Sequence, residues 1–418
     1  MNKIRKNKAL SITAAMLRTI CVLCASGTLL QTFLATVGFT DGQIYLHATL
    51  VQAVNVSTIL LFSHFADAKR PFLRSALVQI PNGLLFLALL PFCFTKGAGI
   101  TAFVLLTAVS LLQSVLTALN TVCEYKFPYL LYRANDYSTV QAIAGVLSAA
   151  VTFFVGEALH YLAQTVSFSR LMLFAFLLSA VFMALAGGIS LWFSPISRAE
   201  RQGQVAASDG ESAHTEAKKV PLRDVFRRPV FYLLVPANLL RGFASGTVAV
   251  LATVAIALGY QADLTTRMVS LSAVANLVAC LLFGIASRFL SPRISIFAGS
   301  LCFLALPLCL LGSPTLFLVA YAVVFFGRGI VDVGVPSLLI CAVDAEIAGP
   351  YNAWRMILHN GGTMLATAIA PFLSPTALLT VSLVASILSG VCFLSLGVLR
   401  RASPTLVSGR PHLFRRTV

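Results

Sequence analysis

Long apolar runs, separated by short clusters of polar and turn-forming residues, dominate the amino-acid sequence. An α-helix needs about 20 residues to cross the hydrocarbon core of a membrane, and most runs reach that length. Cutting the chain at the polar clusters predicts an all-α membrane protein with twelve transmembrane helices, at 13–37, 43–65, 73–94, 99–123, 139–160, 170–193, 230–257, 267–287, 293–312, 315–337, 352–371 and 376–398. The boundary between the last two spans is placed at Pro371 and Pro375, which bracket a predicted turn.

The composition excludes a soluble globular protein. Hydrophobic residues make up 58% of the 418 positions and charged residues only 11%, against roughly 45–50% and about 25% in soluble domains. The nine cysteines lie within or beside apolar runs and lack the spacing of a disulfide framework or a zinc site. We therefore expect them to pack as small hydrophobic residues, and we predict neither a metal nor a cofactor.

The basic residues are distributed unevenly, and they predict the orientation. With the N-terminus inside, three lysines and arginines lie in outer loops, three lie within spans, and the other 24 of the 30 face the cytoplasm. Short cytoplasmic loops carry such a positive excess. We expect a plasma-membrane protein with both termini cytoplasmic, whose net charge of +16 faces the lipid bilayer rather than a nucleic acid. The apolar run after Lys8 is too long for a signal peptide, so it is the first span.

A polar segment at 194–228 divides the spans six to six. It has no run that could bury a core, and its end, 221–229, has the pattern of a short amphipathic helix at the membrane surface. The predicted organisation is an N-terminal tail (1–12), a first six-helix half (13–193), a cytoplasmic linker (194–228), a second six-helix half (229–399) and a basic cytoplasmic tail (400–418).

The two halves contain an internal repeat. The pattern Pro-x-Leu-Leu-x-x-Ala-x-Asp occurs at 128–136 and at 336–344, at the end of the fourth span of each half. The acidic residues four positions before these prolines, Glu124 and Asp332, have the same offset of 208 (332 − 124). A second offset, 221, relates Gly38 to Gly259, Ser63 to Gly284 and Pro71 to Pro292. Matches in register at two places indicate halves that arose by duplication.

The segment SHFADAKRPFLR at 63–74 resembles the motif G-x-x-x-D-x-x-G-R-K of the Major Facilitator Superfamily (MFS) of secondary transporters. It departs from that motif at Ser63, which replaces the first glycine, and at Arg70-Pro71-Phe72, which replace the second glycine and the basic pair. The twelve spans, the central linker and the parallel repeats resemble the same superfamily over essentially the whole chain. This resemblance implies the MFS fold, secondary transport, and a central cavity lined by the first and fourth helices of each half.

Charged residues at the cytoplasmic ends of the spans form a candidate gate. A carboxylate there can cap a facing helix and pair with a base across the two halves, which stabilises one of two packings. The alternative is a set of ordinary interfacial charges that fix topology and solubility. The candidates are Asp67, Lys69, Arg70, Asp136, Arg288, Asp344 and Arg355.

Ionisable residues within the spans are the strongest functional signal, because a charge in hydrocarbon is costly and usually faces a cavity or a partner. They are Arg18, Glu124, Arg241, Arg328 and Asp332. Asn120 with Glu124, and Arg328 with Asp332, are spaced i, i+4 and share a helix face. We predict a centre for substrate binding and coupling. The alternatives are snorkelling of Arg18 to the headgroups, an interfacial position for Glu124, and an intrahelical pair of Arg328 and Asp332 that serves packing alone.

Amides on the same helices are further candidates. Gln31, Asn120 and Asn238 suit the binding of substrate hydroxyl groups, although amides within spans also form helix-to-helix hydrogen bonds. His359 is a candidate proton carrier or a structural histidine.

The sequence therefore favours a transporter over an enzyme. It contains no nucleophile elbow, zinc-peptidase motif, phosphate-binding loop or dinucleotide fingerprint. We expect a monomeric secondary active transporter that moves a small polar or anionic solute by alternating access, coupled to protons. Efflux of hydrophobic drugs is the alternative substrate class, and a membrane sensor or lipid-handling protein with the same fold is the alternative function.

Overall fold

The computed structural model describes residues 3–25, 27–62, 70–94, 99–124, 127–132, 134–196, 229–260, 262–286, 289–342 and 348–402. The first half consists of α1 (Lys3–Ala25), α2 (Gly27–Val37), α3 (Asp41–Phe62), α4 (Pro71–Leu85), η2 (Phe86–Phe94), α5 (Ile100–Glu124), α6 (Phe127–Leu131), α7 (Ala134–Thr165) and α8 (Phe168–Ser190). The second half consists of α11 (Pro229–Ala249), α12 (Leu251–Ala257), α13 (Ala262–Ala286), α14 (Pro292–Leu301), η3 (Cys302–Leu310), α15 (Pro314–Ala342), α16 (Ala348–Ile369), η4 (Ala370–Phe372) and α17 (Pro375–Ala402).

Most of these helices are long and apolar enough to cross a membrane. Among the described residues ten helices meet that criterion, and the bent pair α11 and α12 makes an eleventh. Large apolar side chains such as Leu61, Phe94 and Phe154 are exposed on the outside of the bundle. Such a surface is typical of contact with lipid.

The remaining expected span, 352–371, is the helix α16, which falls below the apolar criterion. It carries Asn352, Arg355, His359 and Asn360. Its surroundings explain this composition, because α16 packs against α11 and α3 and so faces protein. Asn360, for example, donates a hydrogen bond to Asn55 on α3 at 2.8 Å.

Helix α1 begins at Lys3, ten residues before the expected start of the first span. Asn7 is fully buried, its Nδ2 donates to the carbonyl of Ser194 at 2.7 Å, and its Oδ1 accepts from the Ser194 amide at 3.1 Å. The expected tail therefore extends the first helix and fixes the point where the chain leaves α8.

The first span of the second half bends by 40° between α11 and α12. The internal repeat is visible in a matching irregularity of the two halves. The third span of each half changes into a nine-residue 3-10 helix, η2 and η3, and each of these contains a proline. A proline removes one backbone donor and so disfavours regular α-helix.

The two halves meet along two pairs of helices. Helix α7 packs on α13, and α3 packs on α16. A Cβ atom at Gly156 would lie 2.9 Å from Ser270 Oγ, so the close approach of α7 and α13 depends on this glycine. Each half keeps its own apolar core, illustrated in the first half by the edge-to-face rings of Phe33 and Phe176, 5.5 Å apart.

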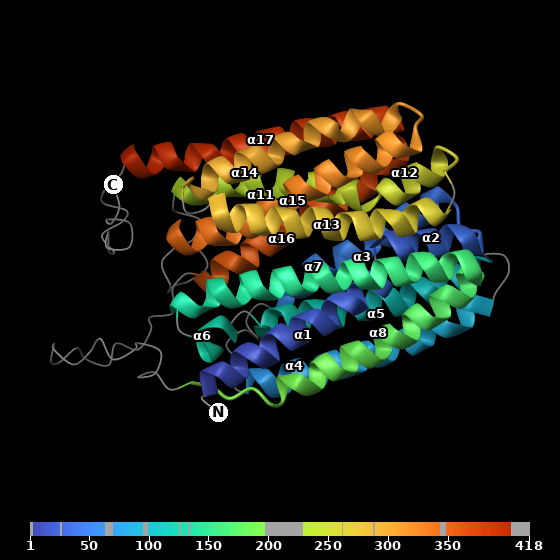
Figure 1. Ribbon diagram of the computed structural model, residues 1–418, viewed down its shortest axis with the longest axis horizontal. Helices are drawn as coiled ribbons and strands as arrows, with labels where there is room; N and C mark the ends of the chain where they lie inside the picture. Colours follow the sequence, from blue (N-terminus) through green and yellow to red (C-terminus); the bar gives the residue numbers. More distant parts are fainter. Residues whose placement is uncertain are drawn as a thin grey trace.

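Polar and apolar contacts also join the halves at the end opposite the start of α1 and the end of α17, which we call the distal end. Gln31 Nε2 donates to the carbonyl of Ala249 at 2.7 Å, and Gln31 Oε1 accepts from Thr253 at 3.2 Å. Tyr45 packs there with Val250, Ala370 and Leu378. In the view of Figure 1, α8 and α17 diverge toward the other end, which we call the terminal end.

Candidate functional site

An ion pair within the first half joins its first and fourth spans. Arg18 Nη1, on α1, lies 2.7 Å from each carboxylate oxygen of Glu124, the last residue of α5. Asn120, one turn earlier on α5, donates to Glu124 Oε1 at 3.0 Å. The i, i+4 spacing thus places the amide and the carboxylate together, as predicted. The two charged side chains are about one quarter exposed, at 26% and 24%.

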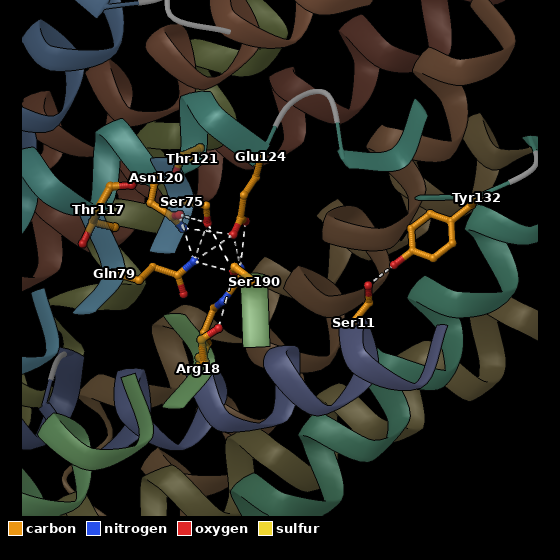
Figure 2. A network of polar contacts seen from close by, with 11 residues as sticks. Ser11, Arg18, Ser75, Gln79, Thr117, Asn120, Thr121, Glu124, Tyr132 and Ser190 are labelled. Atoms are coloured by element: carbon orange, nitrogen blue, oxygen red, sulfur yellow. Dashed lines mark hydrogen bonds and ion pairs between the residues drawn. The ribbon is translucent and has the colours of Figure 1, made fainter. Parts of the chain in front are cut away.

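Gln79 is the hub of the polar network around this pair (Figure 2). Its Nε2 lies 2.9 Å from Asn120 Oδ1, 2.7 Å from Ser75 Oγ and 3.4 Å from Glu124 Oε1, and it also contacts Ser190 on α8. The sequence interpretation missed Gln79. The available signal was the spacing of Ser75, Gln79 and Asn82, which places three polar side chains on one face of α4.

The second half contains the corresponding cluster. Arg241 Nη2, on α11, pairs with Asp332 Oδ1 on α15. Arg328 Nε lies 3.5 Å from Asp332 Oδ2, so the intrahelical ion pair expected from the i, i+4 spacing is present. Its charged atoms are farther apart than those of the pair between Arg241 and Asp332. Arg241 is 8% exposed, whereas the Asp332 side chain is 42% exposed. Asp332 therefore lies between a buried arginine and a space that solvent reaches.

A small pocket adjoins this cluster, and we call it the C-half pocket. Its walls come from α11, α14, η3, α15 and α17. It is lined by Arg241, Ala244, Ser245, Ser300, Phe303, Arg328, Val331, Asp332, Ser386 and Ser389.

The two ion pairs are equivalent in the repeat. Each joins an arginine on the first span to a carboxylate on the fourth span of the same half. The sequence offsets related only the two acids, and the structure adds their arginine partners.

Side chains on two further helices of the second half lie within electrostatic range of Asp332. They are Cys280 on α13 and His359 on α16, and His359 is also within range of Arg241 and Arg328. Titratable side chains of α11, α13 and α16 therefore lie near this carboxylate of α15, which solvent still reaches.

Two candidate amides lie apart from the charged clusters. Gln31 joins the two halves at the distal end, as described above. Asn238 is 1% exposed, and its Nδ2 donates to the Leu234 carbonyl of its own helix at 2.8 Å. Among the three candidate amides, the structure therefore brings only Asn120 into contact with an ionisable side chain of the predicted centre.

Most of the candidate gate residues fall outside the described part of the chain. This holds for Asp67, Lys69, Arg288, Asp344 and the side chain of Asp136. Arg70 is exposed and has a left-handed backbone, with φ of 59°, at the start of α4. Arg355 lies within α16, where Tyr351 and His359 are its electrostatic neighbours.

Comparison with known proteins agrees with this arrangement. A family model described as Major Facilitator Superfamily matches residues 10–367. Among solved structures, a bacterial homologue of the iron transporter ferroportin in its outward-facing state has a TM-score of 0.62 and 15% identity, and the match covers 95% of this chain and 100% of that chain. At this identity the similarity concerns the fold alone. A search of curated protein sequences gave no match. Since the family model covers most of the chain and the structure has the six-plus-six repeat, the protein belongs to the Major Facilitator Superfamily.

Proposed function

We propose that the protein is a secondary active transporter that moves a small anionic or polar solute by alternating access and couples this movement to protons. The observation that carries the proposal is the pair of repeat-related clusters, Arg18 with Glu124 and Arg241 with Asp332. Ionisable side chains at membrane depth cost several kcal/mol on some scales, so they are retained where they act on a solute or an ion.

The charge of the centre favours an anion over a cation. Three arginines and two carboxylates leave an excess of one positive charge. Among the described residues no group of three or more histidine, cysteine or acidic side chains is placed to hold a metal ion. The ferroportin homologue is described as related to an iron transporter, but the donor set described here does not support an iron substrate.

Coupling follows from competition for the arginines. Asp332 is held by Arg241 and Arg328 and is also reached by solvent. An anionic solute that binds an arginine releases the carboxylate from its ion pair. The carboxylate then takes up a proton, because an unpaired negative charge is unfavourable in a poorly hydrated cleft. When the solute leaves, the arginine pairs with the carboxylate again and the proton is released. Glu124 and Arg18 repeat the same arrangement in the first half.

The orientation is part of the proposal. We place the terminal end in the cytoplasm of a plasma-membrane protein because the basic residues cluster there. The distal contacts of Gln31 and Tyr45 then close the outer side, and this arrangement corresponds to an inward-facing state. An introduced cysteine at Ser208 is expected to react with impermeant reagents only from the cytoplasmic side.

A transport screen tests the proposed function. The full-length protein is reconstituted in liposomes with an internal pH dye and exposed to small carboxylates, phosphates, sugars and divalent cations. We expect at least one anionic or polar solute to move together with protons. Proton-independent export of hydrophobic compounds, or movement of iron(II) alone, would contradict the proposal.

A further inference from the structure

Comparing the two clusters position by position shows that they differ in charge. The offset of 208 that relates Glu124 to Asp332 also relates Asn120 to Arg328. Where the first half has a neutral amide, the second half therefore has a cation. The first-half cluster, Arg18 and Glu124, is neutral, whereas the second-half cluster of Arg241, Arg328 and Asp332 has a net charge of +1.

The clusters also differ in volume. The offset of 221 that relates Pro71 to Pro292 relates Gln79 to Ser300, since each is the ninth residue of its helix. In the first half the Gln79 amide fills the space beside Glu124 and contacts Asn120. Ser300 is too short to do so, and its hydroxyl donates instead to the Ile296 carbonyl of its own helix at 3.0 Å. The C-half pocket lies beside this serine.

Arg241 lines the same pocket and has two donors without a partner in the described part of the chain. Its Nη2 pairs with Asp332, but its Nε and Nη1 are buried and have no hydrogen-bond partner among the described residues. Leaving a buried donor of a charged group without a partner is costly. Ser245, one turn further along α11, adds a hydroxyl to the same pocket.

We propose that the C-half pocket binds a small monovalent anion between the guanidinium groups of Arg241 and Arg328, both of which line it. One negative charge neutralises the cluster, and a chloride ion or a single carboxylate group supplies that charge. Ser300 and Ser386 donate to backbone carbonyls, so the arginines supply the N–H groups that hold the anion. The anion is either an inorganic co-ion or the charged group of the transported solute. This inference deepens the proposed function, because the pocket shares Arg241 and Asp332 with the coupling centre.

Thermal unfolding of the purified full-length protein in lipid nanodiscs tests the site. The probes are sodium chloride and sodium acetate, with sodium gluconate, a bulkier hydroxylated carboxylate, at equal ionic strength as the reference. A ligand that binds only the folded state raises the unfolding temperature in a saturable manner. We expect this rise with chloride, acetate or both. A response to chloride alone identifies an inorganic ion as the ligand, and a response to acetate identifies a carboxylate group.

Two substitutions test where the anion binds. Each places the residue of the first half at the equivalent position of the second half. Ser300→Gln is expected to abolish the anion response by filling the pocket, and Arg328→Asn to weaken it. Loss of an interaction with a charged group, worth about 1.5–3 kcal/mol, corresponds to roughly a tenfold or larger change in affinity. Ser395→Gln, the same substitution two turns from Ser389 on α17, serves as the control and should keep the wild-type response.

Equal unfolding temperatures of the wild-type protein in chloride, acetate and gluconate would overturn the inference. So would an unchanged anion response in both Ser300→Gln and Arg328→Asn. Because this experiment requires no transport, an anion response without solute movement would contradict only the proposed function. Transport without an anion response would contradict only this site.

Discussion

At the scale of single residues, the two ion pairs differ in how far each arginine is removed from water. Arg18 is 26% exposed, so water can solvate it if its partner is lost. Arg241 is 8% exposed and depends on Asp332. Removing one partner of a buried pair destabilises a protein more than removing one partner of an exposed pair, because the remaining charge stays buried.

We therefore predict that Asp332→Asn lowers the free energy of unfolding more than Glu124→Gln does. The expected loss is about 3 kcal/mol for Asp332→Asn, which leaves a buried guanidinium without a carboxylate, and about 1 kcal/mol or less for Glu124→Gln. Reversible denaturation in mixed micelles measures both. Equal losses for the two variants would show that Arg241 finds another partner.

The sequence identified the five ionisable residues of the two ion-pair clusters but not how they pair. Helical spacing found the pairs Asn120–Glu124 and Arg328–Asp332, since such pairs depend only on local geometry. The pairs of Arg18 with Glu124 and Arg241 with Asp332 connect helices far apart in the sequence, so spacing could not reveal them. Spacing shows Gln79 only as one of three polar residues on a face of α4, because its contacts with Asn120 and Ser190 come from α5 and α8.

At the scale of the elements, α16 shows how tertiary packing overrides composition. Its polar residues weaken its signal as a membrane span, yet it fits closely against α11. Glycines make this approach possible: a Cβ atom at Gly362 would collide with the Leu239 carbonyl oxygen, and one at Gly242 with the His359 carbonyl oxygen. Small residues at such positions let helix backbones pack tightly. The helix predicted here is present as α16, but its packing partners are set by surface shape.

Gly362→Ala is predicted to destabilise the protein by about 1–3 kcal/mol, because the added methyl group meets backbone atoms that cannot move aside. Gly361→Ala is the matched control, since a Cβ atom at that neighbouring position meets nothing within 4 Å. Thermal unfolding of both variants in nanodiscs makes the comparison. Since alanine favours the helix more than glycine does, equal damage by Gly361→Ala and Gly362→Ala would show that the α11–α16 contact is not what requires glycine at 362.

At the scale of the whole molecule, the distal end holds the halves together through few polar contacts. Gln31 links α2 to both sides of the bend between α11 and α12, and Thr49 donates to Thr367 at 3.0 Å. These hydrogen bonds must break if the distal end is to open. The inward/outward equilibrium should therefore depend on them.

Gln31→Ala is predicted to shift the population toward an open distal end. Spin labels at Thr101 and Thr376, in a cysteine-free background, report the separation of the halves there. Gln43→Ala is the control, because Gln43 accepts from Thr40 at the start of α3 and makes this contact within one half. An unchanged distance distribution in Gln31→Ala, or an equal shift in both variants, would mean that Gln31 does not hold the distal end closed.

The central claim is that the two repeat-related ion pairs couple solute movement to protons. Its most direct test is accumulation of the solute driven by a pH gradient in proteoliposomes, measured beside exchange of bound solute. We predict that Asp332→Asn and Glu124→Gln lose gradient-driven accumulation but retain exchange. Asp41→Asn, at the exposed start of α3, should match the wild type in both assays. Wild-type accumulation with wild-type pH dependence in Asp332→Asn and Glu124→Gln would contradict the account and leave these charges a structural role only.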